Sequence, residues 1–137
     1  MKSSVLKVVA FDFDGTLVDS NHIKDKAFKT IFSDWPEQQE EMMEWHLARN
    51  NIHRDEKFSY FVEKVLKLPE NDKLVFQLIN RFSKLTKNLI IASPLVNGAE
   101  EFLEYFNKKI PIYLISATPQ KELDEIIVAK RIRKYFK

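Results

Sequence analysis

Residues 11–20 read FDFDGTLVDS and directly follow a mostly apolar run, VLKVVA, at 5–10. The run is rich in β-branched residues and leads toward a glycine, a pattern typical of a parallel-sheet strand buried on both faces. Asp12 and Asp14 would then emerge at the carboxyl end of this strand. In open α/β sheets ligands bind at that edge, because the flanking helices leave a crevice beyond the strand tips.

The spacing of Asp12 and Asp14 predicts a need for a cation. Two residues apart in extended chain, their carboxylates project to the same side, and their like charges repel unless a cation or a shared proton relieves them. A divalent metal is the simplest relief. Gly15 lets the backbone turn sharply and bring N–H groups close to an anion. This combination suits phosphoryl transfer.

The segment DFDGTLVDS resembles the first motif of the haloacid dehalogenase (HAD) superfamily, Asp-x-Asp-Gly-Thr/Val-Leu/Ile, often continued by Val-Asp-Ser. The resemblance implies a Rossmann-like α/β core, a phosphatase-like hydrolase activity, Mg²⁺ as cofactor and a small phosphorylated metabolite as substrate. It also implies that Asp12 attacks phosphorus to form an aspartyl-phosphate and that Asp14 serves as general acid and then as general base. Mg²⁺ would be held by Asp12 and by the backbone carbonyl of Asp14.

A second apolar run, IPIYLI at 110–115, predicts another core strand, and Ser116 follows it directly. The resemblance places Ser116 at the second HAD motif, where its hydroxyl would bind a phosphoryl oxygen together with the backbone of Gly15 and Thr16. Thr118 is expected to cap the next helix, with Pro119 in its first turn. The order of strands and helices favours an α/β fold with parallel strands.

Between the two strands, apolar residues recur at helical spacing in the segments 21–32, 37–49, 55–68 and 71–86. They predict a helical block at 18–89, inserted between core segments at 1–17 and 90–137. In the superfamily an insertion at this point is a helical cap that closes over the active site. The polar residues expected to contact substrate from such a cap, with a plain solvated surface as the alternative for each, are Lys24, Arg49, Arg54 and Lys57.

Composition narrows the function classes. The 137 residues carry a net charge of +2, too small to favour nucleic-acid or membrane binding, and contain no cysteine for disulfides or thiolate metal sites. No apolar run approaches the length of a membrane span. The opening residues lack the pattern of a signal peptide, so the cytoplasm is the expected location.

Two parts of the HAD pattern are not found in this sequence. They are a Lys that neutralises the phosphate and a late pair of acids that completes the metal shell; no Asp or Glu follows Glu125. The chain therefore resembles the first half or two-thirds of a phosphatase, with a core of few strands, and we expect it to be inactive or impaired alone. Sheet faces left without neighbours predict an oligomer, or completion of the core by a further C-terminal segment.

Two other functions stay open. A sugar phosphomutase of the same superfamily would use the same two aspartates and differ chiefly in the cap. A non-catalytic binding or regulatory module could keep part of the fold, although it would have no physical reason to keep both aspartates.

Overall fold

The computed structural model describes residues 5–137 and divides them into two compact units. The first, the core unit, comprises the chain up to Asn21 and Leu89–Lys137, and the second, the helical unit, comprises His22–Asn88. These bounds differ by a few residues from the expected insertion at 18–89. Helix α4 spans Asp72–Ala92, so the second boundary lies inside a continuous helix rather than at its end.

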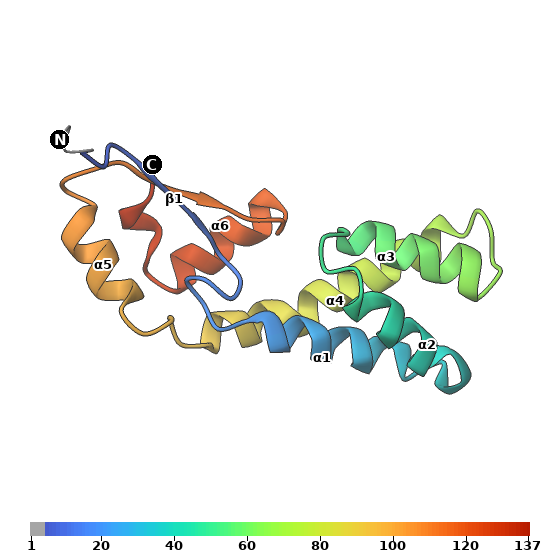
Figure 1. Cartoon of the computed structure of the whole chain (residues 1–137). Coiled ribbons are helices and arrows are strands. Elements are labelled where there is room, and N and C mark those ends of the chain that lie inside the picture. Colours follow the sequence, from blue (N-terminus) through green and yellow to red (C-terminus); the bar gives the residue numbers. More distant parts are fainter. Residues whose placement is uncertain (1–4) are drawn as a thin grey trace. The chain divides into compact units, whose positions relative to one another are not determined.

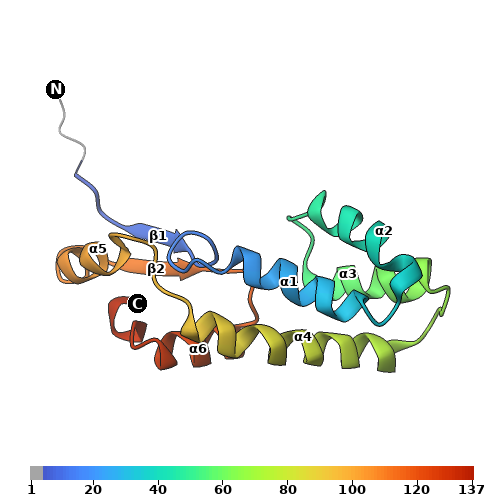
Figure 2. The same cartoon turned by 90° about the horizontal axis from the view of Figure 1, so that it is seen from below.

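The core unit contains a parallel sheet of two strands within the described residues, β1 (Val9–Asp12) and β2 (Ile112–Ile115). Figure 2 shows the strands side by side and pointing in the same direction. Helix α5 (Ala99–Phe106) precedes β2, and helix α6 (Gln120–Ala129) and a 3-10 turn, η2 (Arg133–Tyr135), follow it (Figure 1). This arrangement confirms the predicted α/β class with few parallel strands.

The sheet is covered on one face. Val9 pairs with Ile112 and Phe11 with Leu114, and these residues point toward the interior, where the Phe11 ring meets Phe102 of α5 edge to face at 5.3 Å. The alternate positions Ala10, Tyr113 and Ile115 are exposed. The prediction of strands buried on both faces is therefore wrong for one face of the described sheet. Tyr105 of α5 is also exposed.

The edge of β2 that faces away from β1 also forms a hydrogen bond at the start of the strand. There the Lys137 N–H donates to the Ile112 carbonyl at 2.9 Å. On the edge that faces β1, the Val9 N–H donates to the Pro111 carbonyl at 3.1 Å. Consecutive carbonyls of a strand point to opposite sides, so the two bonds lie on opposite edges of β2. The last residue of the chain thus lies alongside β2.

The segments that enter and leave the helical unit are tied together within the core unit. The Val96 N–H donates to the Leu17 carbonyl at 2.9 Å, and Val18 forms an antiparallel bridge with Leu95. Lys130, at the end of α6, donates from Nζ to the carbonyls of Ile90, Ile91 and Ser93 in the last turn of α4 and just beyond. The carbonyls at a helix end lack the next turn as a partner, and that of Ile90 accepts only one further N–H, from Ser93 at 3.2 Å, among the described contacts, so the lysine acts as a cap.

The helical unit is built around aromatic side chains. Its elements are α1 (Asn21–Phe32), α2 (Pro36–Leu47), α3 (Arg54–Tyr60), a π-helical turn η1 (Phe61–Val65) and most of α4. Phe28 lies centrally in the core, with ring centres of Phe58 at 5.3 Å and Phe82 at 4.6 Å. The predicted helices all occur, but α4 continues past Thr86 to Ala92 and the third segment ends in the π turn.

Candidate active site

Asp12 and Ser116 occupy the ends of neighbouring strands. Asp12 is the last residue of β1 and pairs with Ile115, the last residue of β2, and Ser116 comes next in the chain. Because β1 and β2 are parallel, their carboxyl ends lie at the same edge of the sheet, where α/β proteins bind ligands. The Asp12 side chain is exposed and Ser116 is half-buried. The register thus brings Asp12 and Ser116 to the same edge of the sheet.

The loop after β1 is held by its own backbone and by buried side chains. The N–H groups of Leu17 and Val18 both donate to the Phe13 carbonyl, at 3.0 and 3.1 Å. Phe13, Leu17 and Val18 are almost completely buried. These apolar anchors fix the polar residues between them, Asp14 and Thr16, at the surface of the loop.

Asp14 has a buried partner. Ser20, which has no exposed surface, donates from Oγ to Asp14 Oδ1 at 2.6 Å. A hydroxyl donating to a carboxylate at this distance forms a strong, charge-assisted hydrogen bond. Ser20 stands in the quoted motif, yet sequence reasoning gave it no role, because only the folded loop brings position 20 back to position 14.

Two features of this loop favour glycine at position 15. Its φ of +72° favours glycine, and a Cβ at this position would lie 2.2 Å from Nδ2 of Asn21. However, the Gly15 N–H already donates to the Val18 carbonyl at 2.7 Å. The expectation that this N–H faces a phosphate is therefore not met in this structure: Gly15 shapes the turn instead.

The loop after β2 differs in detail from the prediction. The Thr118 N–H donates to Ser116 Oγ at 3.0 Å, and Pro119, not Thr118, is the N-cap residue of α6, with no side-chain capping bond. Ser116 thereby orients the entry into the helix. Its hydroxyl hydrogen is still a potential donor to an anion, since the contact with Thr118 uses the oxygen as acceptor.

The candidate substrate residues of the helical unit have different environments. Lys24 is half-buried on α1, and Arg49 is exposed just after α2, with its guanidinium 4.8 Å from the Trp45 ring centre. Lys57 is 3% exposed, and its Nζ lies 2.8 Å from His46 Nδ1. The suggestion that Lys57 contacts substrate from the surface is therefore not supported, because its ammonium group lies in the interior of its own unit.

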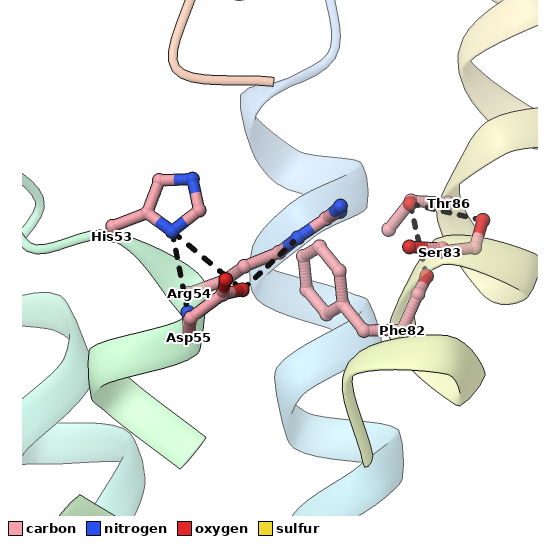
Figure 3. A network of polar contacts seen from close by, with 6 residues as sticks. All are labelled: His53, Arg54, Asp55, Phe82, Ser83 and Thr86. Carbon is pink, nitrogen blue, oxygen red and sulfur yellow. Dashed lines mark hydrogen bonds and ion pairs between the residues drawn. The ribbon is translucent and has the colours of Figure 1, made fainter. Parts of the chain in front are cut away.

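Arg54 lies in a polar network at the start of α3 (Figure 3). Its guanidinium stacks over the Phe82 ring at 5.4 Å, and Nε lies 3.8 Å from Asp55 Oδ1. The side chain is 11% exposed. Phe82 and Asp55 thus hold a cationic, hydrogen-bonding group in a defined position, which suits recognition of a phosphate or a carboxylate.

The charged oxygens at the end of β1 are of the kind that Mg²⁺ prefers. Asp12 offers an exposed carboxylate, although its Oδ1 also accepts the Phe13 N–H at 2.7 Å. Within residues 5–137 no group of three or more His, Cys, Asp or Glu side chains is arranged to hold a metal ion. The donors present fit a metal held by few protein ligands, with the remaining positions filled by water and phosphate, as is usual for Mg²⁺.

A family model of haloacid dehalogenase-like hydrolases matches residues 6–137. The chain belongs to this family. The match covers both strands, the loop that carries Asp12 and Asp14, and the whole helical unit. No curated protein matches the sequence, and no helix of the described residues combines the length and apolar character needed to cross a membrane.

Solved structures of HAD proteins share the fold. YfnB from Bacillus subtilis, described as a HAD-hydrolase bound to magnesium, has 15% identity and a TM-score of 0.64 over 96% of this chain and 62% of its own. A Thermotoga maritima protein described as a β-phosphoglucomutase has 20% identity and a TM-score of 0.62, covering 96% of this chain and 59% of that one. A haloacid dehalogenase-like hydrolase from Streptococcus pneumoniae has 17% identity and the same TM-score and coverage. The chain thus spans about 60% of the length of these relatives.

Proposed function

We propose that this HAD-family chain carries the nucleophile and acid/base half of a Mg²⁺-dependent phosphatase acting on small phosphorylated metabolites. The observation that supports this most is the placement of Asp12 and Ser116 at the carboxyl ends of paired parallel strands, with Asp14 in the loop between the β1 tip and the helical unit. A nucleophile and a phosphate-oxygen donor are then contributed by neighbouring strands.

In this proposal an oxygen of the Asp12 carboxylate attacks phosphorus and forms an aspartyl-phosphate, which divides one difficult hydrolysis into two easier steps. Asp14, positioned by Ser20, gives a proton to the leaving alkoxide and later takes one from the attacking water. Ser116 and the backbone near Thr16 orient phosphoryl oxygens. Bound Mg²⁺, held by Asp12 and the Asp14 carbonyl, would offset the charge repulsion between carboxylate and phosphate.

The helical unit serves as the cap in this proposal, and substrate selection falls to its basic residues. Arg54 is the strongest candidate, because its partly buried guanidinium is held between Phe82 and Asp55. Lys24 and Arg49 are weaker candidates, since an exposed or half-buried cation is equally typical of a solvated helix surface. A location in the cytoplasm, and completion of the sheet by another segment or another chain, remain parts of the same proposal.

The decisive assay is phosphate release by the protein purified from its native source, with a panel of small phosphate monoesters and with Mg²⁺ present or chelated. Asp12→Asn should abolish release while leaving the circular dichroism spectrum unchanged. Asp124→Asn is the matched control, since Asp124 is exposed on α6, where it accepts from Gln120 Nε2 at 2.9 Å. Release that survives in Asp12→Asn or in the absence of metal would contradict the proposal.

A sugar phosphomutase is the second candidate, favoured by the structural similarity to the Thermotoga maritima protein described as a β-phosphoglucomutase. The same assay separates the two functions, because a mutase isomerises a sugar phosphate without net loss of inorganic phosphate. A protein that binds phosphate esters but neither hydrolyses nor isomerises them would instead be a non-catalytic binding module.

A further inference from the structure

A chain of three ionisable side chains crosses the helical unit and links three of its helices. Asp25 comes from α1, His46 from α2 and Lys57 from α3. Asp25 Oδ1 lies 2.8 Å from His46 Nε2, and His46 Nδ1 lies 2.8 Å from Lys57 Nζ. Lys57 Nζ also donates to the His46 carbonyl at 3.4 Å. The proposed catalytic chemistry uses none of these contacts.

The middle and one end of this chain are shielded from water. His46 and Lys57 are each 3% exposed, whereas the Asp25 side chain is 44% exposed. The Phe28 ring lies 4.2 Å from the imidazole, and Lys57 Nζ lies 5.4 Å from the same ring centre. Charged groups in such an apolar setting are costly unless they are paired and hydrogen-bonded. The array is therefore sensitive to any change in its total charge.

The hydrogen bonds fit one distribution of protons over the three side chains. The Lys57 ammonium donates to His46 Nδ1, and the Nε2–H of the neutral imidazole donates to the Asp25 carboxylate, so the three groups together have no net charge. A further proton on Nδ1 would replace the acceptor by a donor. Two cations would then face each other across the same short contact, with a single carboxylate to balance them.

The pKa shifts of His46 and Lys57 also disfavour a second positive charge in this array. Burial lowers the pKa of His46, the hydrogen bond to Asp25 raises it, and the Lys57 charge lowers it again; lowering prevails. Burial likewise lowers the pKa of Lys57, against the opposing charge of Asp25. Asp25 from α1 and Lys57 from α3 are the charged groups that act on the imidazole within the described chain.

We propose that Asp25, His46 and Lys57 form a proton-sensitive latch that fastens α2 and α3 to α1 near neutral pH and loosens them on mild acidification. The observations behind the latch are separate from those behind the proposed phosphatase activity, because its three groups contact one another within the helical unit. Protonation of the His46 imidazole loosens this latch, and α2 and α3 then open locally.

The sign of the response follows from linkage. Because the folded pKa of His46 is lower than the unfolded value of about 6.5, the unfolded or opened state binds more protons below that pH. The stability contributed by the neutral imidazole is fully present above pH 6.5 and is lost as the pH falls toward the folded pKa. One such group changes the opening equilibrium by at most about tenfold per pH unit in this window.

Hydrogen–deuterium exchange of the full chain at several pH values between about 5 and 8 tests the latch, with rates corrected for the intrinsic chemistry of exchange. Amides of α2 and α3 should open more as the pH falls, by up to about tenfold per pH unit, while amides of α5 and α6 in the core unit keep their protection. His46→Gln should remove this pH dependence, because the amide keeps a donor and an acceptor but does not titrate. His22→Gln, a change of an exposed histidine on α1, should preserve it.

Three results would overturn the latch. The first is an unchanged pH response in His46→Gln, and the second is equal loss of protection in α5 and α6, which would indicate global acid unfolding. The third is independent of any variant: a nuclear magnetic resonance titration of wild-type protein in which the His46 imidazole titrates at or above the ordinary histidine pKa. A His46 pKa below the ordinary histidine value, together with selective opening of α2 and α3, supports the proposal.

Discussion

Ser20 Oγ donates a hydrogen bond to Asp14 Oδ1 across 2.6 Å, and the donor is completely buried while the acceptor is half-buried. The two residues lie at opposite ends of the loop that connects β1 with α1. The bond therefore joins the proposed acid/base group to the point where the chain leaves the core unit. A change in the course of the chain at residues 20–21 would be felt directly at the Asp14 carboxylate.

Replacing Ser20 by alanine should leave Asp14 without this partner. We expect a loss of about 1.5–3 kcal/mol in the free energy of unfolding, the usual range for a hydrogen bond to a charged group. The kcat for phosphate release by the protein from its native source should fall while KM changes little, because Ser20 orients Asp14 without touching substrate. Ser20→Thr retains the hydroxyl and should restore most of the kcat; equal losses in both variants would contradict a positioning role.

Gly15 and Gly98 offer a matched pair of glycine substitutions. Both have positive φ, +72° and +82°, but a Cβ at Gly15 would collide with Asn21, whereas one at Gly98 would have no neighbour within 4 Å. Gly98→Ala should cost about 1 kcal/mol, the strain of the left-handed conformation alone. Gly15→Ala should cost more than this, because the Asn21 side chain must move away from the new Cβ.

Denaturant unfolding of the two glycine variants measures the difference. If both lose the same stability, the contact between position 15 and Asn21 does not matter, and the tight loop is not what constrains Gly15. The additional change Asn21→Ala should recover part of the loss in Gly15→Ala and none of the loss in Gly98→Ala.

The sequence was informative where local chemistry dictates local structure. The run before Asp12 predicts β1, and helical spacing predicts α1 with the observed bounds, because both signals are periodic over enough residues to outweigh chance. The family resemblance carried by FDFDGTLVDS is confirmed by the family match over residues 6–137. Placing Asp12 and Ser116 at one sheet edge followed from the strand ends alone.

What the sequence could not predict depends on contacts between distant positions. Lys57 reads as a surface lysine, yet it is buried because His46, eleven residues earlier, offers an acceptor in the interior. The exposed positions Tyr113 and Ile115 read as core because a strand's own sequence does not show how many faces are covered. The role of Ser20 likewise depends on a loop that folds back on itself.

Lys130 should be a strong determinant of core-unit stability. Its Nζ donates to the carbonyls of Ile90 and Ile91 at 3.2 and 3.1 Å, and to that of Ser93. Lys130→Met keeps most of the apolar stem but leaves these carbonyls without the ammonium group, at an expected cost of about 1–3 kcal/mol. Lys121→Met on the exposed first turn of α6 should change the free energy of unfolding by less than about 0.5 kcal/mol. Thermal unfolding of both variants checks this, and equal midpoints would exclude the capping role.

Asp25 and Asp34 allow a test of how burial of the partner sets the value of an ion pair. Asp25 is hydrogen-bonded to the buried His46, and its negative charge acts on the buried Lys57. Asp34 instead pairs with Arg81 at the surface, where both side chains are more than 40% exposed. Asp25→Asn should cost about 3 kcal/mol at pH 7.5, because it leaves the buried Lys57 ammonium without a countercharge. Asp34→Asn should cost less than about 1 kcal/mol, since exposed pairs are screened by water and salt. Denaturant unfolding in low and high salt should show a larger salt effect for the Asp34 pair than for the Asp25 array, whose His46 and Lys57 are buried although Asp25 is 44% exposed. If instead the two substitutions cost the same, the interior array contributes no more than a surface ion pair, and the apolar surroundings of Lys57 do not raise the cost of its charge.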